Sequence, residues 1–89
     1  MSDNRTKVLV IDDEQEYRDV YKRILEKNGY EVLTEENGTG ILQTIKKFEI
    51  HIVVLDQVLP KKNGIELLKE IKNNYEDQVE IIMVTGYGS

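Results

Sequence analysis

Short apolar runs alternate with longer amphipathic segments along this chain. The run at 7–11 is rich in β-branched residues and lacks strict alternation, which is typical of a strand buried on both faces. The apolar runs at 52–56 and 79–84 also predict strands. A further run at 30–34 has glutamates near both ends, and we expect it to form an edge of the sheet. The pattern therefore predicts four short strands.

Three helices are predicted between these strands, over 13–28, 37–48 and 64–73, with a polar loop at 73–78. Asp13 with Glu16, and Asn63 with Glu66, have the spacing of capping boxes at the first and third helix starts. In the first helix, apolar residues recur at helical spacing at Tyr17, Val20, Tyr21 and Ile24. The residues expected to face the core are Ile41, Leu42, Ile45 and Phe48 in the second helix, and Ile65, Leu68 and Ile71 in the third.

The order of elements is strand then helix, three times over, followed by a strand. This order predicts right-handed βαβ crossovers, and hence an α/β fold with a doubly wound parallel sheet covered by helices on both faces. With 89 residues, the chain is expected to form one small domain over 1–89.

Composition excludes several functional classes. Hydrophobic residues at 39% and charged residues at 33% indicate a folded chain, and no apolar run approaches the roughly 20 residues of a membrane span. The polar N-terminus has no signal-peptide pattern, and there is no cysteine, so we expect a cytoplasmic location. A net charge of −5, with no cluster of lysines larger than a pair, argues against nucleic-acid binding.

Residues with useful chemistry follow three of the apolar runs. Asp12 and Asp13 close the first, Asp56 closes the third, and Thr85 follows the fourth. The carboxyl ends of parallel strands lie along one sheet edge, so these side chains are expected to converge on an acidic pocket. Crowded carboxylates repel one another, and Mg²⁺, which prefers oxygen ligands and phosphate, relieves that repulsion. Asp56 is then a candidate nucleophile toward a phosphoryl group.

Taken singly, each of these signals has a simpler interpretation. Asp12-Asp13 could be a helix cap, Asp56 a turn residue, and Thr85 beside Gly86 a plain turn. The single histidine, His51, stands at the start of a strand, and we interpret it as a boundary residue and not a phosphohistidine.

The three signals together carry a family resemblance. Three segments carry it, namely residues 8–13, residues 56–64 with Pro60 and Asn63-Gly64, and Val84-Thr85-Gly86. Together they resemble the receiver domain of bacterial two-component response regulators. The resemblance implies a flavodoxin-like (CheY-like) sheet of order 2-1-3-4 and a phosphoacceptor module, not an enzyme. It implies a histidine kinase or phosphotransfer protein as partner. It also implies that Asp56 is phosphorylated, that Thr85 binds the phosphoryl group, and that Mg²⁺ is held by Asp12, Asp13, Asp56 and the backbone carbonyl of Val58.

The sequence departs from the family pattern by stopping at Ser89. The fifth strand with its lysine, and the last helices, are absent, so we expect a receiver truncated after the fourth strand. The apolar edge at 81–84 would then lie open, which predicts either a fragment or truncated form, or a chain that covers this edge by self-association. Two alternatives stay open: a fragment that interacts without switching, and a Mg²⁺-dependent phosphohydrolase. Such hydrolases usually have a second aspartate two residues after the nucleophile, where this chain has Val58.

Overall fold

A computed structural model describes residues 5–56 and 63–84 of the chain. It has the strands and helices that the sequence predicts, with one added short 3₁₀ helix. In chain order they are β1 (Lys7–Ile11), α1 (Gln15–Lys27), β2 (Glu31–Glu35), α2 (Ile41–Phe48), β3 (Ile52–Asp56), α3 (Gly64–Tyr75), η1 (Glu76–Gln78) and β4 (Glu80–Val84).

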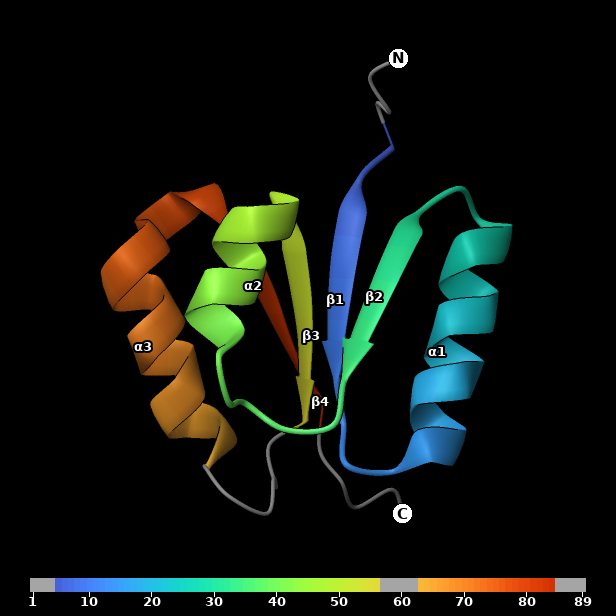
Figure 1. Cartoon of the computed structure of the whole chain (residues 1–89), viewed down its shortest axis with the longest axis horizontal. Coiled ribbons are helices and arrows are strands. Elements are labelled where there is room, and N and C mark those ends of the chain that lie inside the picture. The colour runs from blue at the N-terminus through green and yellow to red at the C-terminus, as the bar shows by residue number, and fades with distance from the viewer. Residues whose placement is uncertain (1–4, 57–62, 85–89) are drawn as a thin grey trace.

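The described strands form one parallel sheet in the order β2-β1-β3-β4, as predicted. Figure 1 shows the arrowheads of the strands at a common edge of the molecule. β1 pairs with β3 so that Val8 faces Ile52 and Ile11 faces Leu55. This register puts the residue that follows Ile11 beside the last residue of β3.

Two apolar clusters lie on opposite faces of the sheet. Alternate residues of β1 and β3, such as Leu9 and Leu55, join α2 and α3 in the larger cluster. The other face of the same strands, including Val10 and Val54, packs against α1. Figure 1 shows α2 and α3 together over one part of the sheet and α1 beside β2. The sheet is thus the middle layer of three.

The two faces differ in how well they are covered. Ile41, Ile45, Leu67 and Ile71 are buried on the α2–α3 side, and the Tyr75 hydroxyl donates to the Leu42 carbonyl across 2.8 Å. On the other side α1 has no buried residue. The larger cluster therefore provides most of the core, and the α1 face is the more open of the two.

The predicted core faces of the helices need correction. In α3 the buried position is Leu67, and Ile65 is exposed, because the helix presents 67 and 71 to the sheet. In α2, Phe48 at the last turn is exposed. In α1 the residues that pack on the sheet are Tyr21 and Leu25, and the other apolar positions of its predicted repeat are exposed: Tyr17, Val20 and Ile24.

Helix starts also differ from the predictions. α1 begins at Gln15 after Glu14, whose side chain makes no cap, so the expected capping box of Asp13 is wrong. α2 begins four residues later than predicted, at Ile41, because the Asn37 side chain accepts from Thr39 N–H and Gly40 adopts a positive φ of 71°. These two features form a turn that a helix cannot contain.

The start of α3 agrees with the prediction in part. Asn63 is the N-cap, and its Oδ1 accepts from the backbone N–H of Ile65 across 2.7 Å. The helix extends to Tyr75, two residues beyond the predicted end, and η1 replaces the predicted loop. None of the described helices is long and apolar enough to cross a membrane.

Candidate functional site

Three aspartates meet at the carboxyl edge of the sheet. Asp12 follows β1, Asp13 is the next residue, and Asp56 ends β3. One carboxylate oxygen from each lies within 4.8 Å of those of the other two. The predicted convergence of these residues is therefore present in the structure. The register of β1 with β3 explains it, since residues that are side by side in a parallel pair point to the same face.

Asp12 is held rigidly by its neighbours. Its backbone N–H donates to the Glu35 carbonyl at the end of β2 across 3.1 Å. Its Oδ1 accepts from the backbone N–H of Glu14 across 2.9 Å. Only 4% of Asp12 is exposed, so this carboxylate has little access to water. This bond forms a turn before α1 and caps no helical N–H, since Glu14 precedes the first helical residue, Gln15.

The electrostatics of the cluster follow from this burial. Burial raises the pKa of Asp12 above its ordinary value of 3.8, and the nearby charges of Asp56, Asp13 and Glu14 add to that, while the hydrogen bond from Glu14 N–H opposes it. Burial likewise raises the pKa of Tyr21 on α1 above 10.0, with the charges of Asp12 and Asp56 as further causes. Burial and the neighbouring carboxylates thus both disfavour the charged form of Asp12.

A divalent cation fits this arrangement. The donors are all carboxylate oxygens, which Mg²⁺ prefers, and two of the three carboxylates are buried at the ends of the adjacent strands β1 and β3. The third, Asp13, is exposed and leaves one side of the cluster accessible to water and phosphate. A cation would also remove the repulsion that raises the pKa of Asp12.

Arg18 is a neighbour of the cluster that the sequence interpretation missed. Its Nη1 donates to the backbone carbonyl of Asp12 across 2.6 Å. The sequence carries no specific signal for this bond, since a basic residue five positions after an acidic pair is common. Val58 and Thr85, which were assigned to the metal and the phosphoryl group, lie outside the described residues.

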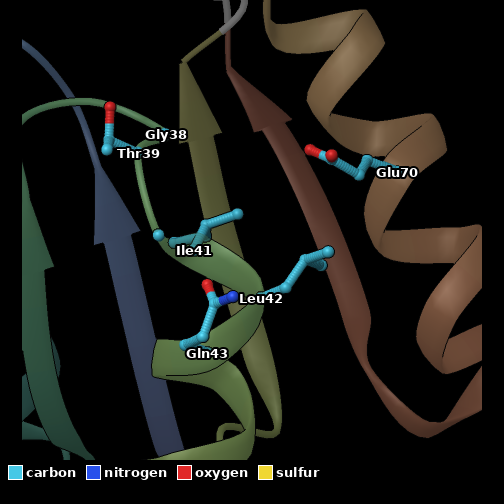
Figure 2. A pocket seen from close by; sticks show the side chains of 7 residues that line it. Gly38, Thr39, Ile41, Leu42, Gln43 and Glu70 are labelled. Carbon is cyan, nitrogen blue, oxygen red and sulfur yellow. The ribbon is translucent and has the colours of Figure 1, made fainter.

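A separate pocket of about 290 Å³ lies between the start of α2 and α3. Figure 2 shows Glu70 projecting from α3 on one side of the pocket. Thr39, just before α2, and Gln43, within α2, lie on the other side. Gly38 lines this pocket, and none of the three aspartates does. The aspartate cluster is therefore separate from this pocket.

Comparison with known proteins identifies the family of the chain. The model of the response regulator receiver domain matches residues 8–89 of the chain. The chain belongs to the response regulator receiver domain family. Curated relatives of this receiver domain include the response regulator RR06 of Streptococcus pneumoniae, 34% identical over 79 residues, and the transcriptional regulatory protein CpxR of Escherichia coli, 35% identical over 83 residues.

Solved receiver structures have the same fold. A CheY-like receiver domain from Methanospirillum hungatei matches with a TM-score of 0.86 and 32% identity, over 97% of this chain and 68% of its own. TrrA from Thermotoga maritima, solved in complex with Mg²⁺ and beryllofluoride, matches with a TM-score of 0.84 and 34% identity, over 93% of this chain and 71% of its own.

The receiver domain is only part of the curated relatives. The matched segment covers 89% of this chain and 36% of RR06, and 93% of this chain and 34% of CpxR. It thus spans about a third of their length. The activities of the whole relatives therefore concern more protein than the matched segment.

Proposed function

We propose that this chain is the phosphoacceptor module of a two-component signalling system, with Asp56 as the acceptor. The observation that carries the proposal is the cluster of Asp12, Asp13 and Asp56 within 4.8 Å at the end of β1 and β3. Receiver domains exchange phosphoryl groups with histidine kinases or phosphotransfer proteins, and either would be the partner here. We expect this exchange to take place in the cytoplasm.

In the proposed reaction, a carboxylate oxygen of Asp56 forms a bond to phosphorus. The bond from phosphorus to the donor nitrogen breaks, and the imidazole that leaves takes up a proton. Asp12 and Asp13 would hold Mg²⁺ together with Asp56, and when bound the ion would offset charge on the transferring oxygens. The backbone carbonyl of Val58 and the hydroxyl of Thr85 remain proposed ligands of the metal and the phosphoryl group.

The position of Asp56 supports its role as nucleophile. It is 4% exposed, like Asp12, and it ends a central strand, so its carboxylate is fixed at the sheet edge. The exposed member of the cluster, Asp13, leaves an approach for the donor. A phosphoacceptor needs this combination of a fixed nucleophile and an accessible face.

The experiment is incubation of the whole chain with acetyl phosphate and Mg²⁺, followed by intact-mass analysis. We expect one phosphoryl group per chain in the wild type and none in Asp56→Asn, which keeps the shape of the side chain. Glu49→Gln, on the opposite edge, is the matched control and should be modified normally. Modification of Asp56→Asn to the wild-type level would refute the assignment, and release of many phosphates per chain would favour a phosphohydrolase.

A second candidate is an interaction module that does not switch. The observation in its favour is β4, the outer strand of the described sheet, where Ile82 is 51% exposed. An apolar outer strand is a template for pairing with another chain. This candidate predicts association whether or not Mg²⁺ and phosphoryl donor are present, and the two candidates are separated by whether Asp56 becomes modified.

A further inference from the structure

We propose that Arg18 is a positioning residue of the acidic site, which fixes the peptide group between Asp12 and Asp13 and so orients the Asp13 carboxylate. This inference rests on the proposed function only in taking Asp13 as a cation ligand. Its basis is one contact: Nη1 of Arg18, on the first turn of α1, donates to the carbonyl oxygen of Asp12 across 2.6 Å.

The contact completes the restraint of Asp12. Its N–H is bonded to Glu35 and its side chain to Glu14 N–H, so the strand end and the carboxylate are already fixed. The carbonyl belongs to the next peptide group, whose nitrogen is that of Asp13. Because a peptide group is planar, a hydrogen bond to its oxygen also fixes the direction of the following N–Cα bond.

Asp13 depends on this restraint more than the other two aspartates do. It is exposed, and its side chain makes no hydrogen bond or ion pair within the part of the chain that the structure describes. Among the described residues, its place in the cluster therefore depends on its backbone and its own rotamer, with no side-chain partner to hold it. Losing the Arg18 contact would let the Asp12–Asp13 peptide rotate, and the Asp13 carboxylate would spend less time beside Asp12 and Asp56.

A positioning role of Arg18 and a simple effect of its charge predict opposite changes in Mg²⁺ affinity when the guanidinium is removed. A guanidinium beside three carboxylates repels a cation, so removing only its charge would strengthen Mg²⁺ binding. Removing a positioning contact would weaken Mg²⁺ binding, because the third carboxylate is no longer preorganised. The sign of the change in Mg²⁺ affinity therefore distinguishes a positioning role from a charge effect.

The decisive experiment is Mg²⁺ titration of the whole chain, followed by the amide resonances of residues 12–15 in NMR spectra. For Arg18→Met we expect a loss of about tenfold in Mg²⁺ affinity, the lower end of the range for residues that orient metal ligands. Arg18→Lys, which keeps a donor and the charge, should recover part of the loss. Arg23→Met removes a charge from an exposed position of the same helix and should bind as the wild type does.

A second measurement requires no metal. In the Mg²⁺-free protein, ¹⁵N relaxation should give the Asp13 amide a lower order parameter in Arg18→Met than in the wild type or Arg23→Met, falling from about 0.85 toward 0.6. Urea unfolding of each variant identifies any general loss of structure. An unchanged Asp13 order parameter, or Mg²⁺ binding as tight as in the wild type or tighter, would overturn the positioning role.

The two proposals fail in different ways. If the wild type binds no Mg²⁺ and accepts no phosphoryl group, the proposed function is wrong, and the relaxation measurement still decides whether Arg18 orders Asp13. If the wild type binds Mg²⁺ and Arg18→Met does so equally well, only the role of Arg18 is wrong.

Discussion

Lys7 and His51 form a reciprocal pair at the edge of the sheet opposite the aspartates. The Lys7 N–H donates to Nδ1 of the His51 ring across 2.9 Å, and the His51 N–H donates to the Lys7 carbonyl across 2.9 Å. The His51 carbonyl accepts from Glu80 N–H in turn. His51 therefore links the starts of β1, β3 and β4, which agrees with its interpretation as a boundary residue.

Replacing this imidazole should weaken the fold slightly without affecting the site. His51→Ala removes the acceptor for Lys7 N–H, and we expect a loss of about 0.5–1 kcal/mol in the free energy of unfolding, because water can replace the lost partner. His51→Asn, which keeps an acceptor, should lose less. Urea unfolding measures both, and a change in Mg²⁺ affinity in either variant would contradict the structural role.

The raised pKa of Asp12 predicts how stability depends on pH without Mg²⁺. An acid whose pKa is raised on folding binds its proton more tightly in the native state. Its stabilising contribution is thus fully present below pH 3.8 and is lost as the pH rises through the native pKa. Asp12→Asn removes this loss and keeps the acceptor for Glu14 N–H. Above that window, in EDTA, the variant should be more stable than the wild type by on the order of 1 kcal/mol.

Mg²⁺ should reverse this order of stability. Binding to the native state stabilises the wild type by about 1.4 kcal/mol when the free ion is at ten times its dissociation constant. Asp12→Asn lacks one ligand and should gain much less. Urea unfolding at neutral pH, with EDTA and then with Mg²⁺, measures both effects. Equal stabilisation of the two proteins by Mg²⁺ would remove Asp12 from the metal site.

Gly38 is a position where the core leaves no space for a side chain. A Cβ at Gly38 would lie 2.7 Å from Cδ2 of Leu67, which is fully buried. Gly38→Ala should therefore cost about 1–3 kcal/mol in the free energy of unfolding, the usual penalty for overpacking. In the double variant Gly38→Ala/Leu67→Val the added methyl has space, so the combined loss should be smaller than the sum of the single losses. Additive losses would show that the two positions do not interact.

The outer strand β4 predicts association between copies of the chain. Ile82 is apolar and half exposed, and β4 pairs only with β3 in the part of the chain that the structure describes. Sedimentation should show a mass that rises with protein concentration, and Ile82→Lys should abolish that rise. Ile24→Lys, on the exposed side of α1, is the matched control. A monomer at all concentrations would refute the prediction.

The positions of the strands and the aspartate cluster could be predicted from the sequence. Short β-branched runs define the strands, and once the sheet is parallel the residues after Ile11 and Leu55 must lie at one edge. The helix starts could not be predicted equally well. Asp13 has the right chemistry and spacing to cap α1, but the helix begins two residues later, after a turn in which the Asp12 side chain accepts from Glu14 N–H.

The faces of the helices that pack on the sheet could also not be predicted from the sequence. α1 has apolar residues on two sides, and periodicity alone does not tell which side meets the sheet. The hydrogen bond from Arg18 to a backbone carbonyl has no signature at all, because it depends on the path of the turn and not on a residue type at Asp12.

The register of β1 and β3 limits which changes in chain length this site can accept. Lys7 and His51 are 44 positions apart, and the same spacing relates Asp12 to Asp56, so one rigid ladder joins both edges. Residues added in the turn after α1 would leave this ladder unchanged. A single deletion within either strand would turn one aspartate to the opposite face. Length variation among functional relatives should therefore occur in the loops and avoid these two strands.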